Sequence, residues 1–125
     1  MALHTQLPIY KAAYKLLDVV TDIVTNMERA FKRSIGEKIS SECLEIMVLV
    51  FRANVAADKS PHLSELLERL QVIELMLRLG MDKRKIHRDA YAGAVELTTS
   101  IGKQCNGWKN AANSRPHRGG QGFHD

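Results

Sequence analysis

The stretch SPHLSELLERLQVIELMLRLG, residues 60–80, decides the fold. Its apolar residues recur at alternating steps of three and four, the heptad spacing of a helix that packs against other helices. These positions are Leu63, Leu66, Leu70, Ile73 and Leu77. Ser60 is predicted to be the N-cap, with Pro61 at the first helical position and Gly80 as the stop. The stretch therefore predicts one long amphipathic helix.

Outward from this stretch, three further segments repeat the helical period and predict helices. The first begins near Pro8, which the first turn of a helix tolerates because its missing N–H would have no partner there. The second is predicted to begin at a capping box, in which Ser34 and Glu37 satisfy each other's N–H groups. The last covers about residues 88–112. Three glycines interrupt it and predict close helix approach there: Gly93, Gly102 and Gly107.

The chain has 125 residues, of which 45% are hydrophobic, and this suits one domain with one core. Because the connections between the four predicted helices are short, neighbouring helices must run antiparallel. We therefore expect an all-α fold, an antiparallel up-down-up-down four-helix bundle, over residues 1–112. Residues 113–125 are rich in glycine and polar residues without an apolar period, and we expect a flexible C-terminal tail there.

Three of the four predicted helices carry more apolar residues than one core needs. The extra positions are Tyr10, Tyr14, Leu17 and Val24 in the first helix, Leu44, Met47, Val48 and Phe51 in the second, and Val72, Met76 and Leu79 in the third. Exposed apolar patches of this size mark interfaces, so we expect a homo-oligomer. Closed symmetry is the usual outcome, but this pattern does not fix the number of subunits.

Residues that could support catalysis or metal binding are scarce. Cys43 and Cys105 lie within apolar helical stripes without a CxxC spacing, so we expect buried free thiols. No Glu precedes a His by three residues, the spacing that di-iron bundles need. His62 and Glu65 are spaced to meet, but one such pair is far more often a surface contact than a metal site. The sequence therefore predicts no enzyme, no metal site and no cofactor.

The sequence also lacks the patterns of export and membrane insertion. The N-terminal residues MALHTQLPIYK do not have the basic region, apolar run and cleavage site of a secretory signal. No stretch reaches the ~18 uncharged apolar residues that a membrane-spanning helix needs. We therefore expect a soluble cytoplasmic protein without a membrane partner.

Basic residues cluster in two of the predicted loops. The chain has 18 Lys and Arg against 14 Asp and Glu, a formal charge of +4. In this bundle topology, the loop after the first helix and the loop after the third helix lie at the same end. Seven basic residues therefore converge there and form what we call the basic end: Arg29, Lys32, Arg33, Lys83, Arg84, Lys85 and Arg88. The acidic residues that offset them are Glu28, Asp82 and Asp89.

Two interpretations of the basic end remain open. Charged loops keep a helical bundle soluble without binding anything. Alternatively, the Lys and Arg side chains neutralise phosphates of RNA or DNA and release counterions, which gives affinity with low sequence specificity. Phe31 is the aromatic residue that lies among these basic residues, and we expect it to pack on the core. Stacking on single-stranded bases is therefore weakly supported.

Several collinear stretches resemble a known family. They are LPIYKAAYKLLDVV, FKRSIGEKI, VFRANVAADKSPHLSELLERLQVIELMLRL and AVELTTSIGKQCNGWKN, and together they cover nearly all of residues 6–110. They look like the accessory variability proteins of diversity-generating retroelements. They are also similar to the wider four-helix-bundle family that includes proteins encoded in intervening sequences of 23S ribosomal RNA genes.

This resemblance implies a homopentamer of bundles with a basic surface that contacts nucleic acid and a partner reverse transcriptase. It adds Arg52 in FRAN and Lys103 in GKQ to the basic positions, beside Lys32 and Arg33 in FKRSIGEKI. We therefore expect a non-enzymatic accessory protein that binds nucleic acid. The alternative is a structural or protein-interaction bundle that does not bind nucleic acid.

Overall fold

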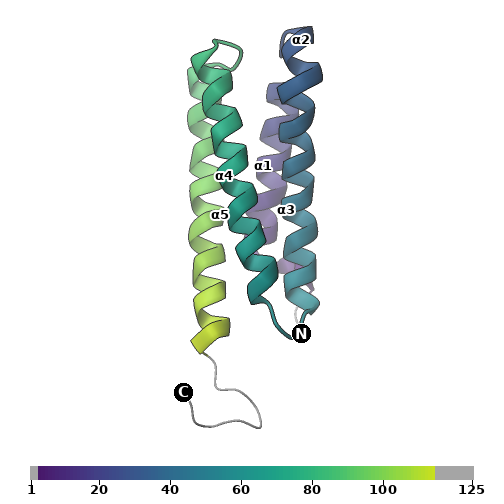
Figure 1. Cartoon of the computed structure of the whole chain (residues 1–125), viewed down its shortest axis with the longest axis vertical. Coiled ribbons are helices and arrows are strands. Elements are labelled where there is room, and N and C mark those ends of the chain that lie inside the picture. The colour runs from purple at the N-terminus through teal and green to yellow at the C-terminus, as the bar shows by residue number, and fades with distance from the viewer. Residues whose placement is uncertain (1–2, 115–125) are drawn as a thin grey trace.

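The computed structural model describes residues 3–114, which form one bundle of helices (Figure 1). The long helices are α1 (Pro8–Thr25), α3 (Glu37–Val55), α4 (Ser60–Asp82) and α5 (Arg88–Ser114). The short helical segments are η1 (His4–Gln6), α2 (Arg29–Phe31) and η2 (Lys32–Gly36), a π-helix that joins α2 to α3. No strand occurs among the described residues, so the all-α prediction is confirmed. α5 ends two residues beyond its expected end, and the remaining part of the expected tail, residues 115–125, lies outside the described residues.

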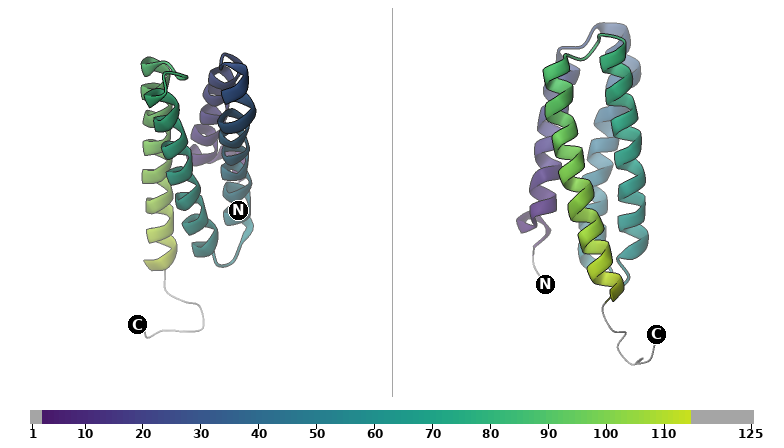
Figure 2. Two further views of the ribbon diagram at one scale, coloured as in Figure 1. Left: turned by 45° about the horizontal axis from the view of Figure 1, so that its top comes forward. Right: turned by 90° about the vertical axis from the view of Figure 1, so that its left-hand side faces the viewer.

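The four long helices run alternately up and down, as predicted (Figures 1 and 2). α1 packs against α3 and α5, and α4 packs against the same two helices. The connections that follow α1 and α4 lie at one end of the bundle. The N-terminal segment, the α3–α4 connection and the end of α5 lie at the other. The topology therefore brings the two basic segments to the same end.

Aliphatic side chains from all four long helices fill the interior. Leu16, Ile46, Leu66 and Ile101, one from each helix, are completely buried. Burying such a side chain contributes roughly 1.5–3 kcal/mol relative to leaving it in water. Thr98 is a polar residue in this core, and its hydroxyl donates a hydrogen bond of 2.7 Å to the carboxylate of Glu74. The buried hydroxyl is therefore satisfied.

The helical segment after α1 begins earlier than the sequence predicts. Glu28 is the N-cap of α2, because its carboxylate accepts a hydrogen bond of 3.3 Å from the backbone N–H of Phe31. The chain is helical from Arg29 onward. Lys32 and Arg33, which were predicted to end a loop, therefore lie on η2.

The predicted capping box at Ser34 and Glu37 is wrong. Ser34 lies inside the helical segment, where its hydroxyl is 3.2 Å from the carbonyl oxygens of Ala30 and Phe31 and donates to them. A serine within a helix bonds to a carbonyl of the preceding turn in this way, whereas a capping serine accepts from an N–H. The N–H groups that a cap at Ser34 would satisfy already belong to a continuous helical segment.

The start of α4 also differs from the prediction. Ser60 is the first residue of α4 rather than its N-cap, and its N–H donates to the carboxylate of Asp58 at 3.2 Å. Lys59 occupies the N-cap position, and its ammonium group caps the preceding helix instead. It donates to the carbonyl oxygens of Ala53 at 2.9 Å and Ala56 at 3.0 Å. A cation at the C-terminal carbonyls of α3 satisfies orphan acceptors and complements the helix dipole.

Gly80 is not the stop of α4, which continues to Asp82. The stop is a Schellman motif, in which the N–H of Arg84 donates to the carbonyl of Met81 at 2.9 Å and the N–H of Lys85 donates to the carbonyl of Gly80 at 2.8 Å. Arg84 occupies the left-handed position of this motif, with φ of 60°, where glycine is the usual residue.

Gly80 has a packing role. A Cβ at this position would lie 2.8 Å from Cγ1 of Ile86 and would contact Cδ1 of that residue even more closely. Ile86 is buried, so the missing side chain of Gly80 lets the α4–α5 connection close over the core. By contrast, the prediction of close helix approach is wrong for Gly93 and Gly107, where a Cβ would meet nothing within 4 Å. A Cβ at Gly102 would make an ordinary contact of 3.8 Å with Leu70.

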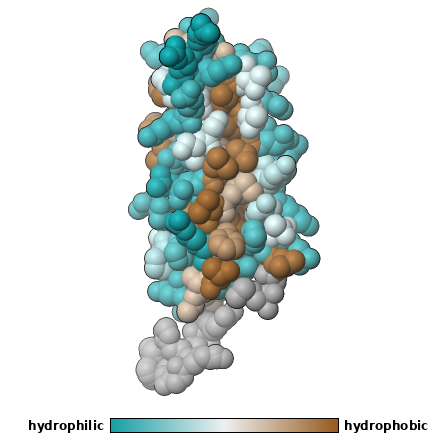
Figure 3. Space-filling view, turned by 90° about the vertical axis from the view of Figure 1, so that its right-hand side faces the viewer, coloured by the Kyte–Doolittle hydropathy of each residue, from teal (hydrophilic) through white to brown (hydrophobic). Residues whose placement is uncertain are grey.

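Two helices expose apolar stripes. On α3 the stripe consists of Leu44, Val48, Phe51 and Val55, and it lies on the side opposite the core residues when 100° is allowed per residue. Figure 3 shows hydrophobic residues running down this side of the bundle. On α4 the stripe consists of Val72, Leu75 and Leu79. The predicted surplus is therefore present on α3 and α4, although Met76 is buried in the core. On α1 the prediction is wrong except at Tyr14, because Tyr10, Leu17 and Val24 pack against the core.

Candidate nucleic-acid interface

The two basic segments meet at one end of the bundle. The carboxylate of Glu28, just before α2, lies 3.5 Å from the ammonium nitrogen of Lys85 in the α4–α5 connection. The ring of Phe31 approaches the last turns of α4, since a Cβ on Gly80 would lie 3.5 Å from it. The structure therefore brings together all seven residues of the basic end, which lie in two segments about fifty residues apart in sequence.

Most of these cations have no acidic partner. Among residues 3–114, Lys85 is the one member of the basic end with a carboxylate within ion-pair distance. Lys32 is half-buried, and the other six side chains belong to exposed residues. Exposed cations without carboxylate partners keep their charge available for an anionic ligand, whereas a cation already paired with a carboxylate has to give up that contact first.

The acidic residues near the basic end differ in their effect. Asp82 pairs with Arg78, with Nε and Oδ1 3.1 Å apart, so its charge is offset by a cation outside the basic end. Glu28 pairs with Lys85. Asp22 was not among the acidic residues expected from the sequence, but it lines a groove beside the α4–α5 connection. Asp89 is exposed beside Arg88 and has no ion pair with a cation of the described residues. Asp22, Glu28 and Asp89 are therefore the carboxylates that offset the basic end.

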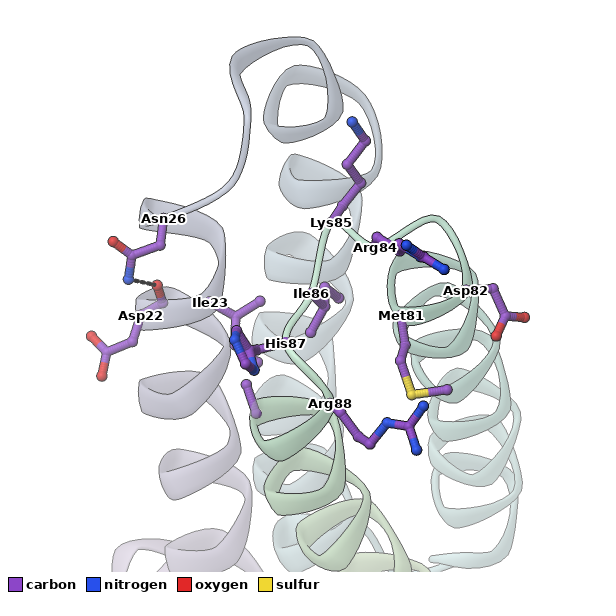
Figure 4. A pocket seen from close by; sticks show the side chains of 11 residues that line it. Asp22, Ile23, Asn26, Met81, Asp82, Arg84, Lys85, Ile86, His87 and Arg88 are labelled. Atoms are coloured by element: carbon purple, nitrogen blue, oxygen red, sulfur yellow. Dashed lines mark hydrogen bonds between the residues drawn. The ribbon is translucent and has the colours of Figure 1, made fainter.

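This groove lies between the C-terminal part of α1 and the α4–α5 connection and has a volume of about 870 Å³ (Figure 4). Figure 4 shows His87 beside Ile23 of α1, Arg88 directed toward Met81 of α4, and Lys85 extending toward the end of the bundle. The cations therefore point in different directions instead of converging on one atom. This arrangement suits an extended polyanion with several phosphates better than one small anion.

Arg52 and Lys103, the two positions added by the family resemblance, do not join the basic end. Arg52 lies on the last turn of α3, and its guanidinium is 3.9 Å from the carboxylate of Glu45. Lys103 is an exposed residue in the second half of α5. Both helical segments lead away from the basic end, so these two cations belong to the side and the far half of the bundle.

A buried ion-pair network between α3 and α4 was not predicted. Glu42 is buried, and both of its carboxylate oxygens accept from Nη1 of Arg69, at 2.9 and 3.2 Å. Arg69 also donates to Glu65 at 3.2 Å. The sequence contains a signal for this network, because Glu42 lies three residues after Ile39 and four before Ile46, on the core face of its helix. A carboxylate at such a position needs a cationic partner from a neighbouring helix.

The thiols of the two cysteines are poorly suited to act as nucleophiles. Burial raises the pKa of the Cys43 thiol to about 12, with a further contribution from neighbouring Glu42. Burial also raises the pKa of Cys105 to about 11, although Lys109 acts in the opposite direction. Both thiols stay protonated near neutral pH, and the thiolate is the reactive form. Among the described residues, no three His, Cys, Asp or Glu side chains gather closely enough to hold a metal ion.

Within residues 3–114, none of the helices combines the length and apolar character needed to cross a lipid bilayer. The fold and the charge distribution together define an antiparallel helical bundle with unpaired cations at one end and apolar stripes along its sides. The chain belongs to the bAvd-like family, whose model matches residues 7–112. This places it with the accessory variability proteins of diversity-generating retroelements, as the sequence resemblance indicated. No curated protein and no solved structure matches the chain significantly.

Proposed function

We propose that this protein is a non-enzymatic, cytoplasmic accessory protein of a diversity-generating retroelement that binds nucleic acid through its basic end. The observation that carries the proposal is the set of exposed cations without carboxylate partners, supplied by two segments that only the folded bundle brings together. Lys and Arg side chains in this state bind phosphates and release condensed counterions, so they supply affinity without reading base sequence. Family membership supports a retroelement role.

The test is a variant in which four members of the basic end lose their charge: Lys32→Gln, Arg33→Gln, Arg84→Gln and Lys85→Gln. None of the four lies in the hydrophobic core, so the helix content should be unchanged. Affinity for RNA or DNA should fall by more than about tenfold at 150 mM salt, and the salt slope should flatten by about 0.9 for each lost phosphate contact. Fluorescence anisotropy over a salt series measures both quantities.

A matched control removes the same number of positive charges from the far half of the bundle. Its substitutions are Lys11→Gln, Lys15→Gln, Arg52→Gln and Lys103→Gln, all at exposed positions. If net charge alone mattered, the two variants would bind equally weakly. If only the control loses affinity, the interface includes Arg52 and Lys103 as the family resemblance implied, and the basic end is a solvated surface.

We further propose that copies of the chain associate, and the family resemblance implies a pentamer. We also propose that a reverse transcriptase is a further partner. The outward stripe of α3 supports association, because Leu44 is 55% exposed and Phe51 is 45% exposed. Leu44→Asp with Val48→Asp should convert the assembly to a 14 kDa monomer in light scattering. A wild-type protein that is already monomeric at micromolar concentration would contradict self-association.

The alternative function, a protein-interaction bundle that does not bind nucleic acid, is favoured by this same stripe. It predicts that neither the variant of the basic end nor its control changes nucleic-acid binding, because the wild-type protein would show none. It also predicts that the two aspartate substitutions on α3 abolish binding of the protein partner while the basic-end variant retains it.

A further inference from the structure

The exposed tyrosine and phenylalanine rings and the unpaired cations lie at opposite ends of the bundle. Proteins that bind single strands combine a basic groove with exposed aromatic side chains on which successive bases stack. At the basic end, Phe31 and Tyr91 are half-buried against the hydrophobic core, and His87 is the one exposed residue with an aromatic ring among the described residues there. The basic end therefore combines many cations with a single exposed imidazole, which is not a platform for successive bases.

The exposed tyrosine and phenylalanine lie toward the other end. Tyr14, in the first half of α1, is 59% exposed, and Phe51, near the end of α3, is 45% exposed. The ring of Phe51 also meets the ring of His4 edge-on, with their centroids 5.0 Å apart. A single strand that used these rings would have to leave the basic end and run along the side of the bundle.

The arrangement of the cations also favours a ligand with two phosphate backbones. The Glu28–Lys85 ion pair joins the two basic segments, and each segment carries three further cations. They are Arg29, Lys32 and Arg33 on the first segment and Lys83, Arg84 and Arg88 on the second. A double helix carries one phosphate per ~1.7 Å of its axis, about twice the density of one of its strands alone. Two cationic segments can each contact one of the two backbones of a double helix.

We infer that the basic end binds the phosphate backbones of a double helix, whether RNA, DNA or their hybrid, in preference to an unstacked single strand. This inference rests on the proposed function and specifies its ligand. Binding through phosphates has a steeper salt dependence for a duplex than for a single strand, with slopes of about 0.9 and 0.7 per contact. With about five contacts and equal affinities at 1 M salt, this difference gives the duplex roughly a tenfold higher affinity at 0.1 M salt.

The experiment compares a 20-base-pair duplex with a single strand of the same length and no self-complementarity, by anisotropy of the full-length protein between 50 and 200 mM salt. The duplex should bind about tenfold more tightly at 0.1 M salt and show the steeper slope. Tyr14→Leu with Phe51→Leu keeps these positions apolar and removes the exposed tyrosine and phenylalanine rings. With the assembly mass unchanged in light scattering, it should leave duplex affinity unchanged. Arg84→Gln with Arg33→Gln should lower it.

The outcomes separate this inference from the proposed function. A single strand that binds as tightly as the duplex, or a loss of binding on removing the rings of Tyr14 and Phe51, overturns the inference while nucleic-acid binding stands. If neither ligand binds, the proposed function fails and the inference fails with it. A duplex affinity that does not change on the loss of Arg33 and Arg84 also overturns the inference, because the duplex would then bind elsewhere.

Discussion

Arg84 offers a test that separates stability from binding. It holds the left-handed position of the motif that ends α4, with φ of 60°. For a residue with a side chain, this conformation costs roughly 1–2 kcal/mol. Arg84→Gly removes that cost. Glycine loses more backbone freedom on folding, however, and this loss destabilises the fold by roughly 0.5–1 kcal/mol. The free energy of unfolding should therefore rise by about 0.5–1 kcal/mol, which raises Tm by roughly 2–6 °C for a domain of this size.

The same substitution should weaken nucleic-acid binding. It removes an exposed guanidinium that has no carboxylate partner, so one phosphate contact is lost and the salt slope falls by about 0.9. The protein should thus become more stable and bind less tightly. Circular dichroism during thermal and denaturant unfolding measures the first effect, and anisotropy over a salt series measures the second.

Arg33→Gly is the matched control, because it also replaces an arginine of the basic end with glycine, but in the other of its two segments. Arg33 lies on η2 with the neighbouring residues in helical conformation, so glycine should destabilise the fold by about 1 kcal/mol. Binding should fall in both variants, whereas stability should change in opposite directions. If Arg84→Gly lowers Tm, the side chain of Arg84 stabilises the fold through contacts that outweigh the backbone strain, and the reasoning fails.

Other variants test the packing of the α4–α5 connection and the burial of the thiols. Gly80→Ala should destabilise by about 1–2 kcal/mol, because overpacking against buried Ile86 exceeds the gain in helix propensity. Gly107→Ala, where nothing would meet the new Cβ, should stabilise by up to about 1 kcal/mol in the same urea titration. Burial raises the pKa of Cys43 to about 12 and that of Cys105 to about 11, from the ordinary thiol pKa of 9.0. The protonated thiols therefore stabilise the fold fully below pH 9.0, and this stabilisation is lost as pH rises from there through the raised pKa values. Between pH 9 and 11, unfolding free energy should therefore fall more steeply in the wild type than in Cys43→Ala with Cys105→Ala, and parallel curves would contradict this.

The helices and their order follow from the sequence because a helical period is a local property. The alternation of three- and four-residue steps through Leu63, Leu66 and Leu70 identifies an apolar helix face, which is buried here. The same alternation on α3, through Leu44, Val48 and Phe51, marks a face that stays exposed. The convergence of the two basic segments follows from topology alone, since short connections force antiparallel neighbours. These predictions needed no knowledge of which side chains touch.

The helix ends were predicted poorly because the same residue type serves different roles. Ser34 and Ser60 both match the pattern of an N-cap, yet one hydroxyl donates to the preceding turn and the other residue lies inside the helix. Gly80 matches a stop signal, but its role depends on Ile86, which reaches it only after the chain has turned. Such contacts between elements cannot be read from the local pattern.

The charges of the site were predicted, but their pairing was not. Glu28 and Asp82 both lie beside basic residues in sequence, and both were counted against the basic end. In the structure, Glu28 pairs with Lys85 from the distant segment, whereas Asp82 pairs with Arg78 one helical turn earlier. Pairing depends on side-chain direction, and the direction of a side chain at a helix end depends on where that end falls.

The positions of the two surfaces determine how association would affect binding. The apolar stripe of α3 runs along the side of the bundle, and the basic end lies across its tip (Figures 1 and 3). Copies that associate through their sides therefore leave their tips uncovered. In a cyclic assembly every subunit has the same orientation relative to the symmetry axis, so bundles that run along this axis would present all basic ends on one face. A duplex crossing that face meets several weak sites at high effective concentration, and the affinity of the assembly exceeds that of one bundle without any new contact. Disrupting the stripe with Leu44→Asp and Val48→Asp should consequently weaken duplex binding even though both residues are remote from the basic end.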